Sequence, residues 1–467
     1  MIFSTLVCLL ITAVAGADLT ARVNAVIGRK SCKKVDIALK IVEASTGRCV
    51  YRRNADKPMI PASNMKILTS AAAIDFLGGD YKFTTKFGLS GGNLIVIGGG
   101  DPLLGDSVTD SQPGKKPGWL FDDIIAALKK KSVDSINDII IDTTFFDDQR
   151  VCPSWPAAQL NQAYACEVSG FNYNANTLRF FVTRSSPRPH IRIEPNTEYV
   201  KYTNKVSLIS KGNSAVGAYR TNIPNKLIVK GKCRKEASFD VAIERPAGLF
   251  GYMLAEHLAS AGIDVDGRLF EKSVKAKKKV KILRTYTTDI KAVLTRCNRD
   301  SFTLAAESLV KTMAAEGNDG TGGSWPGGFA LMKRYLQRCG ADTDGVVIDD
   351  GGGLSRANRL TSAALTKVIA NIYHSRNYKL FRDTLATGGI DGTIGKYFKE
   401  KKYCGRVIGK TGYINSVRTF SGICTTDSGD YIFSIMTEGG TSDVRTAIND
   451  IAKAIIDEYQ EPKPQKR

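Results

Sequence analysis

The spacing of apolar residues changes twice along the 467 residues, from helical to β-type and back to helical, and this restricts the folds that the chain can adopt. Early on, residues 61–77 carry apolar side chains at helical spacing and end in Gly78-Gly79, which predicts a helix. From about 170 to 285, short β-type runs alternate with turn residues and charges, at Thr177–Val182, His190–Ile193, Lys226–Val229 and Phe239–Ile243. Beyond Ile290 the chain is again rich in helical patterns. A chain of this length is expected to form two or three domains, with a β-rich segment in the middle.

Shorter patterns complete the expected elements. Residues 35–42 and 48–51, separated by a Gly-containing turn, predict a β-hairpin near the N-terminus. Helices are expected at 249–261, 301–313 and 328–339, and strands at 406–414, 419–425 and 430–436. An amphipathic helix is expected at 443–459, followed by a Pro- and Lys-rich tail from 461.

Composition places the chain among ordinary globular proteins, with 43% hydrophobic and 24% charged residues. The formal net charge of +20 favours anionic partners, which include nucleic acid, an anionic membrane and an anionic wall polymer. No motif selects nucleic acid. The lysine runs at 129–131 and between Lys275 and Lys281 are typical of a solvated face.

The first 17 residues form an apolar run that ends in Ala15-Gly16-Ala17, a small-residue pattern typical of a cleavage site. We therefore expect a signal peptide at 1–17 and an exported protein. The alternative is a buried N-terminal helix. The run is too short for a transmembrane span, and no other stretch is long and apolar enough.

Nine cysteines follow the expected signal peptide, and export would permit disulfides between them. An odd number leaves at least one unpaired. The pairs closest in sequence are Cys32 with Cys49 and Cys152 with Cys166, but the sequence leaves the connectivity open. The chain has no C-x-x-C and only three widely spaced histidines, so a zinc site is improbable.

The first chemically suggestive motif is Ser63-Asn64-Met65-Lys66, at the start of the helix expected from Pro61 or Ala62. A spacing of three residues puts Ser63 and Lys66 on one helical face. A Lys amine can take the proton of a serine if burial or neighbouring cations lower its pKa. By itself the motif is weak, because a capping serine followed by a solvated lysine has the same sequence.

Two further motifs follow in the chain. Lys410-Thr411-Gly412 lies on an expected strand, where a lysine and a hydroxyl can bind a carboxylate and the glycine leaves room for a docked peptide. Between the two motifs, Ser301-Phe302-Thr303 opens an expected helix, where Ser301 could relay a proton. Taken alone, the Lys410-Thr411-Gly412 motif is compatible with a solvated lysine. The Ser301-Phe302-Thr303 motif is compatible with an ordinary helix cap.

Taken in order, the three motifs resemble the active-site set of the penicillin-recognising serine enzymes. About 235 residues separate Lys66 from Ser301, and this long gap with its β-rich filling resembles the class C low-molecular-mass penicillin-binding proteins, the D-Ala-D-Ala carboxypeptidase/endopeptidase family. The resemblance spans roughly residues 18–459. Further matching segments are Gly98–Pro102, Ser154-Trp155-Pro156 before Tyr164, Asp350–Thr361 with its three glycines, and Gly389–Thr393.

The resemblance implies an α/β (α+β) penicillin-binding, serine β-lactamase-like transpeptidase fold, an antiparallel sheet with helices on both faces. The catalytic domain would comprise 18–86 and 286–460. It would be interrupted by inserted domain II, at 87–172 and 243–285, and by a nested β-rich domain III at 173–242, with a tail at 461–467. The implied activity is hydrolysis of peptidoglycan stem peptides as a carboxypeptidase, with endopeptidase action on cross-links as a further possibility. β-Lactams would acylate the same serine, and no metal or organic cofactor is implied.

The resemblance also implies a role for each matching residue. Ser63 would be acylated and Lys66 would be its general base. Ser301 would pass a proton toward the leaving nitrogen, Lys410 would supply positive potential beside that relay, and Thr411 would hold the terminal carboxylate of the substrate. The N–H groups of Ser63 and Tyr413 would form the oxyanion hole, with Gly412 between the lysine–threonine pair and Tyr413.

Three positions depart from the family pattern. Thr303 stands where the family usually has Asn, so one hydroxyl replaces an amide that both donates and accepts. Tyr413 replaces a small hydroxyl residue and adds bulk by the cleft. Gln159 aligns with an acidic residue that pairs with the amine of the stem diamino acid, whereas Arg356 matches a candidate for its carboxylate. These departures keep a non-catalytic wall- or penicillin-binding protein open as an alternative. A β-lactamase is a third hypothesis, which the chain length and the insertion disfavour.

Overall fold

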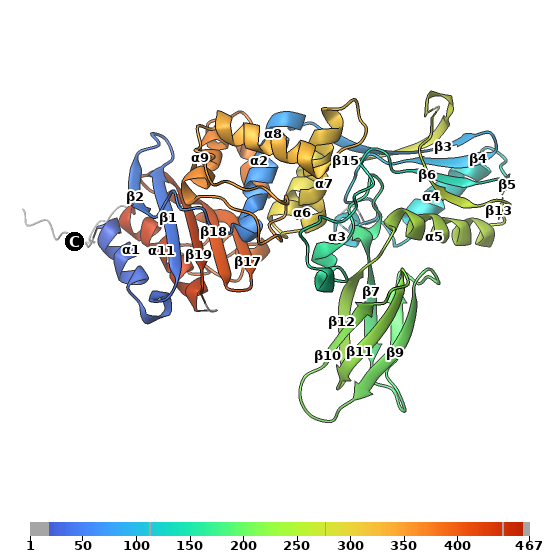
Figure 1. The fold of residues 1–467 in the computed structure, drawn as a ribbon, viewed down its shortest axis with the longest axis horizontal. Coiled ribbons are helices and arrows are strands. Elements are labelled where there is room, and N and C mark those ends of the chain that lie inside the picture. The colour runs from blue at the N-terminus through green and yellow to red at the C-terminus, as the bar shows by residue number, and fades with distance from the viewer. Residues whose placement is uncertain (1–17, 112–113, 276, 441–442, 461–467) are drawn as a thin grey trace, which may run out of the picture.

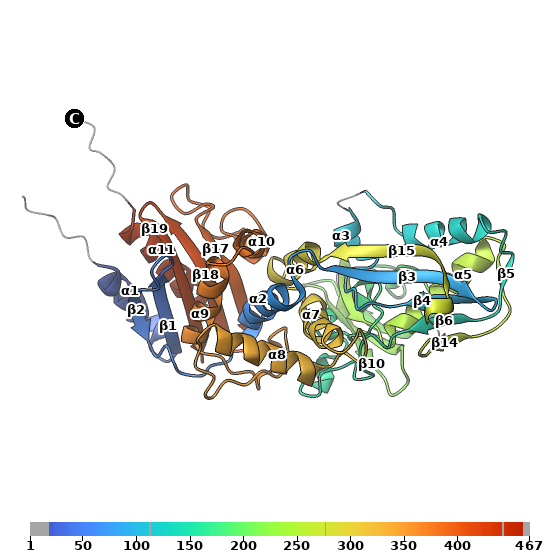
Figure 2. The same cartoon turned by 90° about the horizontal axis from the view of Figure 1, so that it is seen from above.

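The computed structural model describes residues 18–111, 114–275, 277–440 and 443–460. The expected signal peptide at 1–17 and the tail at 461–467 lie outside the described residues. The molecule is elongated, with the two ends of the chain in one half and an inserted region in the other (Figures 1 and 2). Within the described ranges, no helix is long and apolar enough to cross a membrane.

A six-stranded antiparallel sheet forms the half that contains both termini. Its order is β16-β17-β18-β19-β1-β2. The strands are β1 (Asp36–Glu43), β2 (Cys49–Arg53), β16 (Ala386–Thr387), β17 (Val407–Ile414), β18 (Val417–Thr426) and β19 (Gly429–Glu438). The expected hairpin and the three expected C-terminal strands are confirmed. Strands β18 and β19 are buried almost throughout, because helices cover both faces of the sheet.

One face of this sheet packs on α1 (Leu19–Ile27) and α11 (Val444–Glu458), which also contact each other. The other face packs on a helical layer, with α2 and α9 against the sheet and the others beyond them (Figure 2). This layer comprises α2 (Met65–Leu77), α6 (Ile290–Asn298), α7 (Thr303–Glu316), α8 (Trp325–Arg338), α9 (Ser362–Tyr373) and α10 (Tyr378–Thr384). Helix α2 is buried on nearly all sides, which fits its run of Ala, Leu and Ile. It ends at Gly78, whose φ of 88° suits glycine.

The inserted region begins with a second sheet of five strands in the order β14-β6-β4-β3-β15. They are β3 (Lys82–Ser90), β4 (Asn93–Ile97), β6 (Ile139–Asp142), β14 (Leu269–Glu271) and β15 (Lys281–Asp289). Helices α3 (Ser107–Ser111), α4 (Trp119–Lys129) and α5 (Pro246–Ser260) belong to this region, together with the short parallel pair β5 (Ser135–Ile136) and β13 (Asp264–Val265). The chain enters on β3 and leaves on β15, which pair antiparallel, and the proposed boundaries at 86 and 286 fall within these two strands.

Two three-stranded sheets pack together in the segment that projects from this region (Figure 1). One has the order β12-β7-β8 and the other β10-β11-β9. Their strands are β7 (Thr177–Thr183), β8 (His190–Glu194), β9 (Lys201–Leu208), β10 (Ala215–Arg220), β11 (Lys226–Cys233) and β12 (Glu236–Ala242). The sequence predicted β7, β8, β11 and β12. It missed β9 and β10, whose inward positions include the polar Asn204 and the small Ala218, so that few large apolar side chains mark them as strands.

All nine cysteines in the described residues are free thiols. The two short-loop pairings considered from the sequence are therefore not formed. Cys32 is buried whereas Cys49 is exposed on β2, and the Cys152 thiol donates to the carbonyl of Asp349 at 3.1 Å. Closeness in sequence does not bring two Cβ atoms into the geometry that a disulfide needs.

Candidate active site

Ser63 lies in a single 3₁₀ turn, Ala62–Asn64, directly before α2, and its side chain is half-buried. Lys66 follows in the first turn of α2 and is fully buried. Its Nζ atom donates to Ser63 Oγ at 3.3 Å and to the carbonyl oxygen of Gly352 at 2.6 Å. The expected Ser–Lys pair is thus a direct contact. Ser63 is partly exposed to solvent, whereas Lys66 is buried away from water.

The surroundings of Lys66 favour a neutral amine. Burial lowers the pKa of Lys66, and the nearby Cys297, Glu307 and Asp350 act in the opposite direction. A buried lysine with a depressed pKa can accept the proton of a neighbouring hydroxyl. The arrangement therefore supplies what a serine nucleophile needs.

The glycine segment that starts at Asp350 connects Lys66 to a buried carboxylate. Glu307, on α7, accepts the backbone N–H of Gly352 at 2.6 Å and that of Gly351 at 3.0 Å. It also accepts the indole N–H of Trp325 at 2.8 Å. Gly352 therefore accepts a hydrogen bond from Lys66 through its carbonyl and donates one to Glu307 through its N–H.

Asp350, the residue directly before the three glycines, holds the same segment through other backbone groups. Its carboxylate accepts the N–H groups of Gly353 and Ser355, each at 2.6 Å, and the indole N–H of Trp155 at 2.9 Å. Trp155 comes from the Ser-Trp-Pro segment of the inserted region. That segment and the glycine segment, which the sequence singled out separately, meet here.

Close packing explains why these positions are glycine. A Cβ on Gly352 would lie 2.6 Å from Thr303 Cγ2 and 2.8 Å from Glu307 Oε1. A Cβ on Gly353 would lie 1.8 Å from the carbonyl oxygen of Ala62, and Gly353 has a φ of 80°. Only glycine lets the backbone approach both the Ser63 turn and the start of α7 this closely.

Strand β17 passes beside the same turn. A Cβ on Gly412 would lie 2.9 Å from the backbone nitrogen of Ser63. Lys410 is fully buried and donates to the Thr411 carbonyl at 2.9 Å, and the Thr411 hydroxyl donates to that of Thr393 at 3.0 Å. Burial, and then the charge of Lys66, lower the pKa of Lys410 well below its usual value. The structure thus brings Ser63, Lys66 and the lysine–threonine–glycine strand together.

The first half of β17 pairs with the two-residue strand β16, and the second half leaves that side of the strand open. The N–H of Gly388 donates to the Val407 carbonyl at 2.8 Å, so the backbone groups of Val407 point toward β16. Because antiparallel strands alternate, the N–H groups of Thr411 and Tyr413 point to the same, open side. The Tyr413 side chain is 62% exposed, and the guanidinium of Arg418 lies 3.7 Å from its ring centre.

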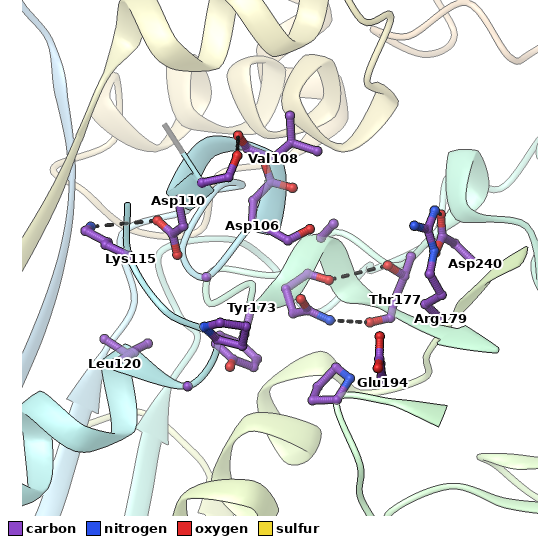
Figure 3. A pocket seen from close by; sticks show the side chains of 18 of the residues that line it. Asp106, Val108, Asp110, Lys115, Leu120, Tyr173, Thr177, Arg179, Glu194 and Asp240 are labelled. Atoms are coloured by element: carbon purple, nitrogen blue, oxygen red, sulfur yellow. Dashed lines mark hydrogen bonds and ion pairs between the residues drawn. The ribbon is translucent and has the colours of Figure 1, made fainter. Parts of the chain in front are cut away.

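Ser301 and Thr303 lie where the helical layer meets the inserted region. Ser301 has a φ of 63°, and Thr303 is the first residue of α7, with its methyl group against Gly352. Both line a cavity of about 1060 Å³ that extends into the inserted region, between Asp106, Tyr173, Arg179 and Glu194 (Figure 3). Among the described residues, no side-chain hydrogen bond joins Ser301 to Lys66 or Lys410. The structure therefore places Ser301 on a cavity wall rather than in bonding contact with either lysine.

Two candidate specificity residues lie on separate loops. Arg356 is exposed and donates to the carbonyl of Asn415 at 2.9 Å, just beyond the end of β17. Gln159 lies half-buried in the 3₁₀ turn Ala157–Gln159. No side-chain hydrogen bond joins them within the described part of the chain.

Sequence reasoning missed Glu307, Trp325 and Cys297. Cys297 is buried near both lysines and opposes the lowering of their pKa values. Glu307 had a signal in the sequence, since it is a lone acid one turn after Thr303 among Ala305, Ala306 and Leu309. A charge at that place on a buried helix needs a partner.

Comparison with known proteins agrees with this geometry. The model of the D-Ala-D-Ala carboxypeptidase 3 (S13) family matches residues 19–458. A D-alanyl-D-alanine carboxypeptidase from Actinomadura sp. (strain R39) is 26% identical over 447 residues, covering 90% of this chain and 80% of the relative. Among solved structures, penicillin binding protein 4 from Haemophilus influenzae matches with a TM-score of 0.79 and 21% identity, covering 94% of this chain and 99% of that chain. A peptidoglycan endopeptidase from Bdellovibrio bacteriovorus matches with a TM-score of 0.54 and 17% identity, covering 93% and 96%.

These matches confirm the expected penicillin-binding fold and the class C low-molecular-mass type of penicillin-binding protein. The chain belongs to the D-Ala-D-Ala carboxypeptidase 3 (S13) family of serine carboxypeptidases.

Proposed function

We propose that this chain hydrolyses the D-Ala-D-Ala bond of peptidoglycan stem peptides through an acyl-enzyme on Ser63. The observation that carries the proposal is the contact of a fully buried Lys66 with the half-buried Ser63, 3.3 Å apart. The neutral amine of Lys66 takes the hydroxyl proton as Ser63 Oγ attacks the penultimate D-Ala carbonyl. Water then hydrolyses the ester and releases the shortened peptide.

The open side of β17 supports the rest of the mechanism. An extended peptide that lies along it meets the N–H of Tyr413, which, with the N–H of Ser63, stabilises the developing oxyanion. The Thr411 hydroxyl and the ammonium form of Lys410 hold the terminal carboxylate. Ser301 passes a proton to the departing D-Ala nitrogen beside the positive potential of Lys410, and this step requires Ser301 to come closer to the lysines when substrate is bound.

Arg356 is the proposed contact for the stem diamino acid, whereas Thr303 and Tyr413 contact other parts of the substrate. Arg356, beyond the end of β17, suits the carboxylate of the diamino acid. Thr303 offers one hydroxyl to the substrate amide. β-Lactams acylate Ser63 in the same way. Because peptidoglycan lies outside the cytoplasm, the protein acts in the periplasm or another extracytoplasmic space. We also propose that the chain cleaves peptide cross-links as an endopeptidase, because this reaction breaks the same kind of amide bond.

A fluorescent penicillin and a defined pentapeptide test the proposal together. The wild-type chain is expected to be labelled and to release D-Ala, whereas Ser63→Ala should do neither. Labelling without release would favour the alternative of a penicillin-binding wall protein with little turnover, for which Thr303 in place of Asn is the specific observation. Mass spectrometry of defined muropeptides then identifies which bond is cut, because the product masses differ.

A further inference from the structure

Positive charge is concentrated in the segment that projects from the inserted region. Residues 173–242 contain thirteen Lys and Arg residues against four Asp and Glu residues, so they carry +9 of the net +20 of the chain. None of these residues is among those assigned to the catalytic site. Figure 1 shows strands β7 to β12 extending away from the rest of the molecule.

The strand register places five of these lysines on one face. In the parallel pair β9–β11, Lys201 lies beside Lys226 and Lys205 beside Lys230, while Lys232 follows two residues after Lys230. All five side chains are exposed. We call this set, Lys201, Lys205, Lys226, Lys230 and Lys232, the lysine face.

Packing fixes the side on which these lysines lie. Leu227, Val229 and Val206 alternate with them along the strands and are buried against the sheet β12-β7-β8. Because side chains alternate strictly between the two faces of a strand, burial of one set forces the other set outward. The lysine face is therefore a rigid array of charges on a sheet and not a flexible run.

The array has little counter-charge of its own. The remaining outward positions of β9, β10 and β11 are Thr203, Ser207, Ala215, Gly217, Tyr219 and Ile228, none of which is acidic. Among the described residues, only Lys201 has a carboxylate partner, Glu198. Like charges directly opposite each other on a sheet destabilise it, so folding alone does not account for two neighbouring Lys–Lys pairs.

We propose that the lysine face binds a linear polyanion with regularly spaced phosphates or carboxylates, such as an anionic wall polymer, and so holds the enzyme beside its substrate. Strand geometry spaces the Cα atoms of paired lysines about 4.8 Å across the sheet, and it spaces successive lysines roughly 6.6 to 13 Å along each strand, in a narrow ribbon that suits an extended chain. Attachment to lipid needs apolar insertion as well as charge, and Tyr219 is the one large exposed hydrophobic side chain on this face. The ring of Tyr219 is covered by Lys230 at 4.3 Å.

Labelled long-chain inorganic polyphosphate tests the proposal by fluorescence anisotropy at increasing NaCl concentration. The triple variant Lys205→Gln/Lys230→Gln/Lys232→Gln should bind about tenfold or more weakly than the wild type, with a shallower dependence on salt. The matched control is Lys129→Gln/Lys130→Gln/Lys131→Gln, which removes the same charge from an exposed run at the end of α4. It should bind nearly as well as the wild type.

Two further measurements keep the test decisive. Release of D-Ala from a soluble pentapeptide should be unchanged in both triple variants, so the result is separate from the proposed function. The thermal midpoint of the lysine-face variant should not fall, because like-charge repulsion is removed. Equal loss of polyphosphate binding in both variants, no loss in either, or lysine-dependent binding to phosphatidylglycerol vesicles without binding to polyphosphate would overturn the proposal.

Discussion

The Nζ atom of Lys66 lies 2.6 Å from the carbonyl oxygen of Gly352, closer than the 3.3 Å that separates it from Ser63 Oγ. That carbonyl therefore orients the amine toward Ser63 Oγ. Glu307, which holds the N–H of Gly352, acts on the lysine through this peptide group and is a positioning residue.

Replacement of Lys66 by Met should remove the base while keeping the length of the side chain. Acylation by a penicillin is expected to slow by about 10²–10⁴-fold, the usual contribution of a general base. Stopped-flow labelling measures the rate. Labelling at the wild-type rate would show that another group takes the Ser63 proton.

Gly352→Ala should move the carbonyl that orients Lys66, because the added Cβ meets Thr303 and Glu307 at less than 3.0 Å. We expect acylation to slow by up to about 100-fold and the free energy of unfolding to fall by about 1–3 kcal/mol. Gly217→Ala is the control, since its Cβ would make only ordinary contacts, at 3.5 Å or more. Similar effects of the two substitutions would contradict the packing argument.

Glu307→Gln should change how stability depends on pH. Burial and the charge of Asp350 raise the pKa of Glu307 from 4.5 to about 8. The folded protein then keeps a proton between pH 4.5 and 8 that the unfolded chain has lost, so this group contributes less stability as pH rises through that range. Glutamine does not titrate. The thermal midpoint of the variant should therefore fall less than that of the wild type between pH 5 and 8, and a parallel fall would argue against this role.

The same substitution has a kinetic consequence. Where Glu307 is ionised, its carboxylate opposes the lowering of the Lys66 pKa, so loss of that charge should lower the Lys66 pKa further. Since only the neutral amine accepts a proton, the rise of acylation rate with pH should move to lower pH. A purely structural role would reduce the rate at every pH without moving the profile.

Arg356→Ala should separate substrate binding from chemistry. Loss of a charge-assisted hydrogen bond to the diamino acid is expected to raise KM for a stem peptide roughly tenfold, while penicillin acylation stays near the wild-type rate. Arg376→Ala, an exposed arginine between α9 and α10, serves as the control. A fall in kcat with unchanged KM would place Arg356 elsewhere in the reaction.

The sequence contained most of the candidate site in two short motifs, because Ser63 lies near Lys66 and Lys410 near Gly412 in the chain, and their residue types fit the proposed chemistry. The glycines of 351–353 were visible as a pattern, but their reason was not, since it depends on Glu307 and Ala62 approaching from other parts of the chain. Local patterns also could not place Ser301, whose distance from the lysines is set by how the helical layer packs on the inserted region. Strands β9 and β10 were missed because the polar Asn204 and the small Ala218 stand at inward positions, which weakens the alternation that marks a strand.

The N–H of Ile290 donates to the carbonyl of Tyr81 at 2.9 Å, so the chain leaves and rejoins the catalytic half at one point, and a short splice could in principle close it. However, excision of the residues between Tyr81 and Ile290 would leave two groups in the remaining half without their hydrogen-bond partners. Asp350 would lose the indole of Trp155, and the wholly enclosed ammonium of Lys311 would lose Asp147. A shortened protein made from this scaffold would have to re-create both partnerships, because the insertion supplies part of the packing around the candidate active site.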